Sequence, residues 1–505
     1  MSDKLSKGQR LGQGAYGIVY KANDKEGRQL AVKRLLVDET NTFIGSLREA
    51  DMVSRFKHPH LVNSEVKYGT VFEGPLSPVD QKSVKDDNIT FIMERAAGNA
   101  YEYFKKSRSL FEIKTFVVHV LLALEYMHAK GVSHQDIKPQ NVLYFINNNI
   151  ISFKVADLGL AYWNSKYGYQ SSTASTSWYR APEISYNAVQ PSRYNHMVDI
   201  WSVGCMLYEL IFGYPLLQHI TDDNDHAIIK AYQDLVPGCG GTITWDQFWS
   251  KSVRFTYFNT SIADLYNLRS LLQSLLAFHP TQRSPATIAL NHPFFVEFHE
   301  YIASVRSSFK PMLDTNIAIN NTSCTERRFG IIVAANVLST RTQELSMEHY
   351  RPLFHAMMLF DRALTHNILN QNPKYAKITD SNGNYWSFDG TVVRFMVCYY
   401  IIYKYFGLLK PSINWKDLLT EKYCTPECLN LARDFERYVV VDVCKFQIYQ
   451  HTPLDIAGML GIELSERDIF DLYTYYVGNI WTNTSSEMIL ESFLRHRTKP
   501  IIKCK

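Results

Sequence analysis

The chain is organised around one stretch of eight residues, His134-Gln135-Asp136-Ile137-Lys138-Pro139-Gln140-Asn141. This stretch places a carboxylate, a cation and a carboxamide close together in the sequence. Four other short motifs lie on either side of it: Gly12-x-Gly14-x-x-Gly17, Ala31-Val32-Lys33, Asp157-Leu158-Gly159 and Ala181-Pro182-Glu183. Each motif alone is a weak signal, but the order in which they occur along the chain is specific.

Length and composition predict a globular protein with two domains. A chain of 505 residues exceeds what one hydrophobic core usually supports. Hydrophobic residues make up 46% of the sequence and charged residues 20%, which is an ordinary globular balance. The formal net charge of +4 is too small to indicate nucleic-acid binding by itself, so we expect no direct nucleic-acid partner.

The eight cysteines are scattered and form no Cys-x-x-Cys pair. Cys424 and Cys428 lie four residues apart, but no second Cys or His pair follows nearby, so free thiols are favoured over a metal site. The residues after Met1 form no apolar signal region, and no apolar run reaches the length of a membrane span. We therefore expect an intracellular soluble protein, in the cytoplasm or nucleus, without a membrane partner.

The glycine motif lies within a predicted β segment at residues 8–20, and another strand is predicted at residues 29–35. A Gly-x-Gly-x-x-Gly pattern also occurs in dinucleotide-binding folds, but there a helix follows the glycines directly. Here the following residues, 18–22, are typical of a strand. The pattern therefore favours a β-hairpin that covers nucleotide phosphates, because glycine has no Cβ and lets the backbone approach.

Taken in this order, the motifs resemble the signature of eukaryotic-type protein kinases. The resemblance covers residues 5–298 and implies an α+β bilobal fold, with a β-rich N-lobe at 5–94 and a helical C-lobe at 98–298. It implies ATP and Mg²⁺ as cofactors and Ser/Thr side chains of proteins as substrates, because Lys138 follows Asp136 as it does in Ser/Thr kinases. A dead kinase fold that serves as a scaffold is the alternative, although every catalytic residue type is present.

The resemblance assigns a role to each residue of the central stretch and its partners. Asp136 would orient the substrate hydroxyl and accept its proton, and Lys138 would stabilise charge on the transferred phosphoryl group. Thr176 would link the activation loop to both. Asn141 and Asp157 would hold Mg²⁺, which prefers oxygen ligands.

The resemblance also implies an ATP site. Lys33 would contact the phosphates and pair with Glu49, which lies on a predicted helix at residues 41–56 that resembles the helix C of kinases. The alternative is that Glu49 is an ordinary charged residue on the solvent-exposed side of that helix. Met93 would guard the back of the site, and the backbone of Glu94 and Ala96 would hold adenine. The full set of residues expected around ATP is Leu11, Gly12, Gln13, Gly14, Ala15, Tyr16, Gly17, Ile18, Val19, Ala31, Lys33, Met93, Glu94, Ala96 and Leu143. Away from ATP, Arg283 would form a buried, fold-holding ion pair with Glu183.

The segment Trp178-Tyr179-Arg180-Ala181-Pro182-Glu183 resembles cyclin-dependent kinases in particular. In that family a tyrosine at the position of Tyr16 can be an inhibitory phosphorylation site, and the threonine beside it is Ala15 here. Smaller and more polar side chains at positions 174 and 175 leave proline-directed substrate specificity open.

Two positions depart from the family pattern. The arginine of the usual His-Arg-Asp is Gln135, and the arginine that usually follows the Asp-Phe-Gly segment is Tyr162. In the family these two arginines and a third, Arg48 here, hold a phosphate on the activation loop through bidentate contacts. The phosphoacceptor position falls at Ser171. We expect phosphorylation there to be unnecessary or weakly effective.

Beyond a polar linker at 299–325, residues 326–505 read as an all-α domain that resembles a cyclin box. The cues are residues 327–332, 360–364 and 434–453, and Lys404 and Glu436 fall where cyclins contact the helix C of a kinase. A tethered cyclin-like partner would bind its kinase in cis at an effective concentration of about a millimolar. The alternative is a helical tail that recruits substrates or a separate cyclin.

Overall fold

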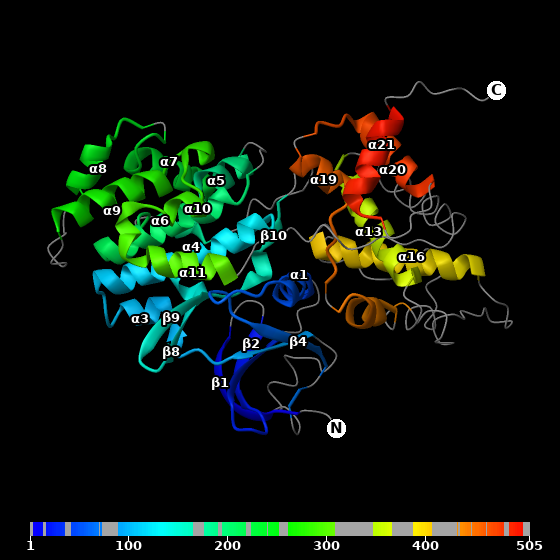
Figure 1. Cartoon of the computed structure of the whole chain (residues 1–505), viewed down its shortest axis with the longest axis horizontal. Helices are drawn as coiled ribbons and strands as arrows, with labels where there is room; N and C mark the ends of the chain where they lie inside the picture. Colours follow the sequence, from blue (N-terminus) through cyan, green and yellow to red (C-terminus); the bar gives the residue numbers. More distant parts are fainter. Residues whose placement is uncertain are drawn as a thin grey trace. The chain divides into compact units, whose positions relative to one another are not determined.

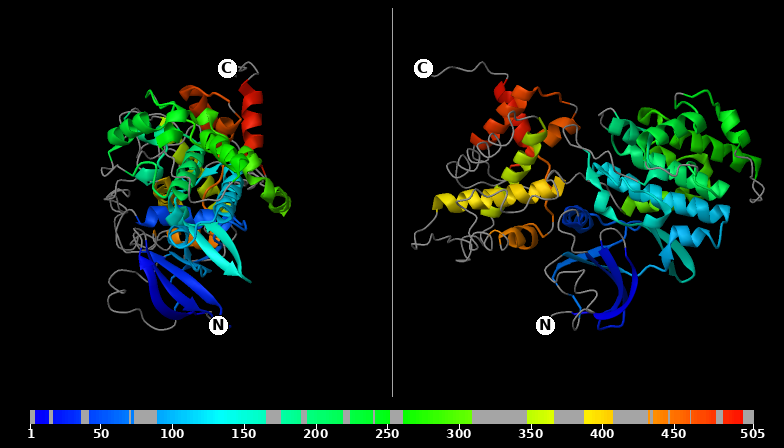
Figure 2. Two further views of the ribbon diagram at one scale, coloured as in Figure 1. Left: turned by 90° about the vertical axis from the view of Figure 1, so that its left-hand side faces the viewer. Right: turned by 180° about the vertical axis from the view of Figure 1, so that it is seen from behind.

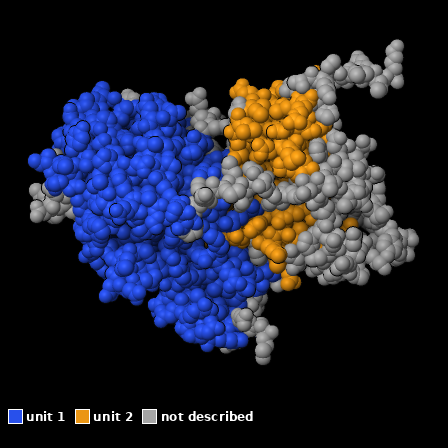
Figure 3. Space-filling model, in the orientation of Figure 1, with its two compact units in different colours: residues 1–34, 55–164, 170–313 blue, residues 35–54, 165–169, 314–505 orange. Residues whose placement is uncertain are grey.

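The computed structural model describes most of the chain, in seventeen ranges: 4–13, 17–35, 42–69, 71–72, 89–164, 176–189, 194–218, 224–239, 241–251, 261–308, 347–365, 387–406, 432, 435–445, 447–460, 462–478 and 484–497. The chain divides into two compact units (Figure 3). The first holds residues 1–34, 55–164 and 170–313, and the second holds residues 35–54, 165–169 and 314–505. Within the described ranges, no helix is both long and apolar enough to cross a membrane.

The first unit begins with a five-stranded sheet in the order β1-β2-β3-β5-β4 (Figure 1). The strands are β1 (Ser6–Gln13), β2 (Gly17–Asn23), β3 (Gln29–Leu35), β4 (Ser64–Tyr68) and β5 (Ile89–Glu94). Alternation of side chains builds it: in β2, Ile18, Tyr20 and Ala22 are buried on one face, while Lys21 lies on the other. β1 pairs antiparallel with β2, which gives the hairpin predicted from the glycine motif.

Helices form the rest of the first unit, grouped apart from the five-stranded sheet in each view (Figures 1 and 2). They are α3 (Ala100–Phe104), α4 (Leu110–Ala129), α5 (Pro182–Val189), α6 (Met197–Phe212), α7 (Asp225–Leu235), α8 (Trp245–Lys251), α9 (Ile262–Leu275), α10 (Ala286–Ala289) and α11 (His299–Ser308). The predicted order of a β-rich lobe followed by a helical lobe is confirmed.

Two helices form the core of this lobe. α4 starts with a capping box in which Ser109 and Glu112 satisfy each other's backbone N–H groups. α6 is buried along nearly its whole length and stops at Gly213, whose φ of 86° is a left-handed conformation that glycine adopts without strain. Because α4 and α6 pack together, they form a rigid base for the short strands that follow α4.

Those short strands carry the chain through the predicted catalytic region. β7 (Val132–Ser133) pairs with β10 (Tyr162–Trp163), and β8 (Val142–Asn147) forms a sheet with β6 (Gly98–Asn99) and β9 (Ile150–Val155). The central stretch lies between β7 and β8, and Asp157 lies just after β9. Paired strands therefore flank the central stretch, and paired strands likewise flank the segment Asp157–Gly159.

The predicted buried ion pair between Arg283 and Glu183 is confirmed. The Arg283 side chain has no exposed surface and donates to both carboxylate oxygens of Glu183, at 2.5 and 2.7 Å. It also donates to the backbone oxygens of Ala277, Met197 and Phe278. A single guanidinium thus joins the start of α5 to the start of α6 and to residues 277–278.

Helix α11 occupies the first part of the segment predicted as a linker. Ile302 and Val305 are buried on it, and Arg306 donates to Glu125 on α4 at 2.8 and 3.0 Å. The hydroxyl of Tyr301 lies 2.6 Å from the Nε2 atom of His60. This apolar and charged anchoring was not evident from the polar character of the segment, and the domain boundary itself stays a prediction.

The second unit is helical where the structure describes it. Its elements are α1 (Thr42–Arg55, of which residues to 54 belong here), α13 (Met347–Thr365), α16 (Ser387–Phe406), the π-helix η8 (Tyr438–Val443), α19 (Pro453–Met459), α20 (Glu466–Gly478) and α21 (Ser486–Arg497). α13 packs against α16. Of the three cyclin-box cues, residues 360–364 lie in α13, residues 434–453 lie partly outside the described ranges, and residues 327–332 lie wholly outside them.

Buried polar contacts hold this unit together. The carboxylate of Asp455 accepts from Arg351 at 3.1 Å and lies 3.2 Å from the ring of His355, and all three side chains are buried. Tyr476 donates to Asp361 at 2.9 Å. Both contacts tie α13 to elements more than 100 residues further along the chain.

The ion pair of Arg283 should dominate the stability of the helical lobe. In Glu183→Ala, a buried guanidinium would lose its counter-charge, and we expect a loss of about 3–5 kcal/mol in the free energy of unfolding. The control, Asp234→Ala, removes the exposed pair with Lys230 and should cost below about 1 kcal/mol. Thermal unfolding of both variants measures this; equal melting temperatures would contradict it.

Candidate active site

A buried carboxylate sets the backbone of the central stretch. Asp199, on α6, accepts from the backbone N–H groups of His134 and Gln135, each at 2.8 Å, and lies 2.8 Å from Nε2 of His128. Burial opposes ionisation of Asp199, but the hydrogen bond from His128 and the backbone donors hold its pKa below the usual value. Gln135 has a φ of 67°, which is uncommon for a residue with a Cβ. The two backbone bonds to Asp199 keep it there.

Three predicted site residues meet at Asp136: Lys138, Thr176 and the predicted magnesium ligand Asn141. Its Oδ1 atom accepts from the hydroxyl of Thr176 at 3.0 Å and from the backbone N–H of Thr176 at 3.2 Å. Its Oδ2 atom lies 2.8 Å from Nζ of Lys138 and accepts from the amide of Asn141 at 2.8 Å. Lys138 also donates to the Thr176 hydroxyl at 2.8 Å. The Asp136 carboxylate is therefore fixed from both sides.

A second cluster lies beside it. Nζ of Lys33, on β3, is 3.2 Å from Oδ1 of Asp157, whose side chain keeps 37% of its surface exposed. The cation of Lys33 holds the pKa of Asp157 below its usual value, so the carboxylate stays ionised near neutral pH. The predicted partner Glu49 is buried on α1 in the other unit, and its pairing with Lys33 stays a prediction.

The donor set fits a hard divalent cation. Both hydrogen bonds from the side chain of Asn141 use its amide nitrogen, which leaves the amide oxygen as a ligand. With the ionised carboxylate of Asp157 this offers oxygen atoms, which Mg²⁺ prefers. The backbone bond from Ala156 N–H to the Asn141 carbonyl, at 2.9 Å, keeps the two segments adjacent.

The residues predicted around ATP lie in or just after the strands of the β-rich lobe, and one lies in β8. Leu11–Gln13 end β1, Gly17–Val19 begin β2, and Ala31 and Lys33 lie in β3, while Met93, Glu94 and Ala96 end or follow β5, and Leu143 lies in β8. A Cβ added to Gly12 would meet no described atom within 4 Å, so no close approach among the described residues requires glycine there. Gly14, Ala15 and Tyr16 lie outside the described residues, as does Ser171.

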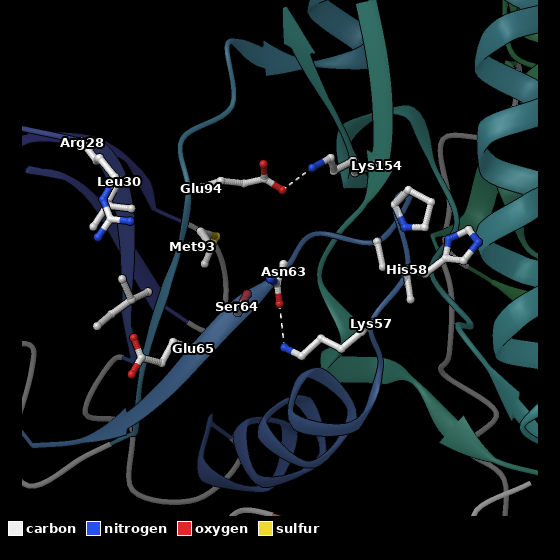
Figure 4. Close-up of a pocket in the computed structure, with 13 residues that line it drawn as sticks. Arg28, Leu30, Lys57, His58, Asn63, Ser64, Glu65, Met93, Glu94 and Lys154 are labelled. Atoms are coloured by element: carbon white, nitrogen blue, oxygen red, sulfur yellow. Dashed lines mark hydrogen bonds and ion pairs between the residues drawn. The ribbon is translucent and has the colours of Figure 1, made fainter. Parts of the chain in front are cut away.

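A separate cavity of about 770 Å³ borders the end of β5 (Figure 4). It shares Met93 and Glu94 with the predicted ATP set, and Glu94 pairs there with Lys154. The other lining residues are Arg28, Leu30, Lys57, His58, Pro59, Leu61, Asn63, Ser64, Glu65 and Ile92. Asp136, Lys138 and Asp157 do not line it, so this cavity is distinct from the catalytic cluster.

The two departures from the family pattern form a neutral hydrogen-bonded group. Gln135 is buried and donates from its amide to the hydroxyl of Ser133 at 3.0 Å. Ser133 pairs with Tyr162 across β7 and β10, and its hydroxyl lies 3.2 Å from the side-chain oxygen of Asn164. The sequence motifs did not single out Ser133, Asn164 or His128. The partners of Ser133 and Asn164 follow from the pairing of β7 with β10, and the partner of His128 follows from the packing of α4 on α6.

The second unit contains the residues predicted to contact helix C. Glu436 is half-buried just before η8. Lys404 lies in α16, and its side chain is outside the described residues. Sequence reasoning missed Asp51, on α1, which accepts from the hydroxyl of Tyr405 at 2.7 Å. Its only signal is an acid placed among the apolar positions of a helix.

This bilobal fold, with a lysine–aspartate pair and an aspartate held between a lysine, an asparagine and a threonine, defines a phosphoryl-transfer enzyme. The sequence model of the protein kinase domain family matches residues 5–295. The chain therefore belongs to the protein kinase family and is a protein serine/threonine kinase.

Three relatives illustrate its place among kinases. The probable cyclin-dependent kinase 10 of Dictyostelium discoideum is 33% identical over 57% of this chain and 77% of its own length. The mitogen-activated protein kinase spk1 of Schizosaccharomyces pombe is 30% identical over 60% and 80%, respectively. The cyclin-dependent kinase D-1 of Arabidopsis thaliana is 29% identical over 58% and 72%.

The hydroxyl of Thr176 should matter for turnover more than for stability. Thr176→Val removes a donor to Asp136 and an acceptor for Lys138, and hydrogen bonds to charged groups predict a loss of about 10- to 100-fold in kcat. Thr176→Ser keeps the hydroxyl and should retain most activity. Steady-state kinetics and melting temperature together check this; full kcat in Thr176→Val would show that the hydroxyl has no part in the reaction.

Proposed function

We propose that this kinase is activated in cis by a cyclin-like helical domain formed by residues 326–505. One observation carries the proposal. Residues 35–54 lie inside the region matched by the kinase family, yet they belong to the same compact unit as residues 314–505. This segment holds α1, which resembles the helix that cyclins bind in cyclin-dependent kinases.

Specific contacts within the second unit support this reading. Asp51 accepts from Tyr405 on α16, and one turn later the backbone oxygen of Ser54 accepts from the amide of Gln447 at 3.5 Å. Arg362, in the cue at 360–364, donates to the backbone oxygen of the same Gln447 at 2.7 Å. Two of the segments that resemble a cyclin box are thus connected to α1 through one residue.

The catalytic residues would act by position and charge. Asp136 would hold the substrate hydroxyl and accept its proton, and Lys138 would stabilise charge as the phosphoryl group moves. Lys33 would hold the phosphates, with Asn141 and Asp157 holding Mg²⁺, which neutralises phosphate charge when bound. The substrates would be proteins with an acceptor Ser or Thr.

The same chain would not need a phosphorylated activation loop. A phosphate orders that loop in related kinases through arginine forks. Here the corresponding positions are Gln135 and Tyr162. Gln135 donates a neutral hydrogen bond to Ser133 of β7, and Ser133 pairs with Tyr162 of β10. A neutral link requires no phosphate. A permanently tethered activator also reduces the need for one, because tethering makes its binding intramolecular.

Transfer of the γ-phosphate to a degenerate Ser/Thr peptide library tests the activity and shows whether a proline must follow the acceptor. Asp136→Asn should lower kcat by about 10²–10⁴-fold, because it removes the proton acceptor but keeps the shape. Equal phosphate transfer by the wild-type protein and Asp136→Asn would favour the alternative, a catalytically inactive kinase fold that serves as a scaffold.

Cis activation is tested by cutting the folded full-length chain at a protease site inserted between residues 309 and 325. After the cut, activity should fall on dilution, because binding has become bimolecular. The uncut protein at the same dilution is the control. A kinase fragment that keeps full activity after separation by gel filtration would show that the helical unit only recruits partners.

Phosphate independence has its own test. Treatment with a broad-specificity protein phosphatase should leave kcat unchanged, and so should the triple substitution Ser171→Ala, Ser172→Ala and Thr173→Ala. The reason is that the described links between β7, β10 and the central stretch are neutral hydrogen bonds and backbone pairs. A large loss of activity in either experiment would overturn the idea.

A further inference from the structure

Asp51 is an unusual residue for its place on α1. Its neighbours on the buried side of the helix, Leu47, Ala50 and Met52, are apolar and have no exposed surface. Asp51 is equally buried, although carboxylates are rarely found in such positions unless they are hydrogen-bonded. The partners that accept this helix must therefore satisfy a charge as well as cover an apolar face.

Among the described contacts of this carboxylate, two are donors from the second unit. The phenol of Tyr405, at the end of α16, donates to Oδ2 at 2.7 Å. The backbone N–H of Tyr449, which lies a few residues after η8, donates to Oδ1 at 3.4 Å. The two donors come from separate segments, so both hydrogen bonds form only when α16 and the segment after η8 are placed correctly relative to each other.

Packing holds both donors in position. The ring of Tyr405 stacks on the ring of Tyr449, with centroids 6.1 Å apart, and meets Phe406 edge-on at 5.4 Å. The ring of Tyr449 lies 4.9 Å from His355, which contacts the buried Asp455. A donor fixed in this way loses little conformational entropy when it binds.

This arrangement discriminates between partners. A surface that presents apolar groups at the same places would bury the charge of Asp51 with fewer hydrogen bonds, and such a mismatch is strongly unfavourable. Discrimination of this kind comes from the penalty against the wrong partner as much as from contacts with the right one.

We propose that Asp51 is a specificity residue, which restricts α1 to the helical unit of its own kind and bars activators whose matching surface is apolar. The proposal rests on the cis activation proposed above. It adds the chemistry of the recognised surface: a phenol hydroxyl and a backbone N–H that converge on one carboxylate.

The first experiment is a double-mutant cycle in the full-length chain, cut in the linker after folding, with dissociation of the two halves measured by dilution. Tyr405→Phe should raise the dissociation constant by about 10- to 100-fold, and Asp51→Leu should weaken binding as well. The combination of both substitutions should recover part of the loss, because an apolar residue then meets the ring at position 405, although the backbone N–H of Tyr449 still lacks its acceptor. A double variant as weak as the sum of the two single losses would overturn the proposal.

Melting temperatures show whether each variant folds. Should Asp51→Leu fail to fold, Asp51→Asn replaces it, since a neutral amide is less costly to bury than a carboxylate. Tyr405→Phe should then weaken binding less in the Asp51→Asn background than in the wild type. An equal loss in both backgrounds would count against the proposal.

The second experiment tests selectivity directly. Cut wild-type protein labelled uniformly with ¹⁵N is mixed with unlabelled cut protein that carries both Asp51→Leu and Tyr405→Phe, and the re-formed pairs, which the label makes distinct in mass, are counted by native mass spectrometry. Like halves should pair with like, whereas equal amounts of all four combinations would overturn the specificity role. This readout is a mass and not an activity. A failure of cis activation, seen as an active separated kinase half, is therefore distinguishable from a failure of selectivity.

Discussion

The hydrogen bonds between Asp199 and the backbone of the central stretch are the constraint on which the catalytic geometry depends. They hold Gln135 in a left-handed conformation, and the next residue is Asp136. A change of backbone direction at this point would turn the Asp136 carboxylate away from Thr176 and Lys138. Since Asp199 lies on α6, the buried core of the helical lobe determines where the acid points.

Gln135 and Tyr162 stand where related kinases have arginines, and both replace a charged side chain with a neutral one. An arginine cluster without its phosphate is a set of repelling cations, so a kinase that uses one is held inactive until it is phosphorylated. Gln135 and Tyr162 carry no charge and are buried, and their described links to Ser133 are a neutral hydrogen bond and a backbone strand pairing. The buried carboxylate Asp51, by contrast, lies on α1, whose residues up to 54 belong to the second unit, and it is bound there by Tyr405. In the proposed function, control has moved from a covalent modification to a contact within the chain.

Sequence reasoning was most successful where function requires residues close together in the chain. Asp136, Lys138 and Asn141 lie within six residues of one another, and the structure brings them together with Thr176. The kinase family and the two-lobed order were predicted from motif order. Asp51 could not be predicted, because its donor Tyr405 lies 354 residues away and nothing in a local pattern selects that pair. Helix α11 was missed for a similar reason: its partners Glu125 and His60 belong to distant elements.

The distance between Asp51 and Tyr405 along the chain also has a consequence during synthesis. A ribosome that adds about 5–20 residues per second needs on the order of 20–70 s to make the 354 residues that separate them. For the last part of that interval, after residue 295 has been added, the kinase domain has been synthesised but the donor for Asp51 does not yet exist. On the proposed mechanism, a nascent or prematurely terminated chain would be inactive, so completion of translation would itself be the step that releases the enzyme's activity.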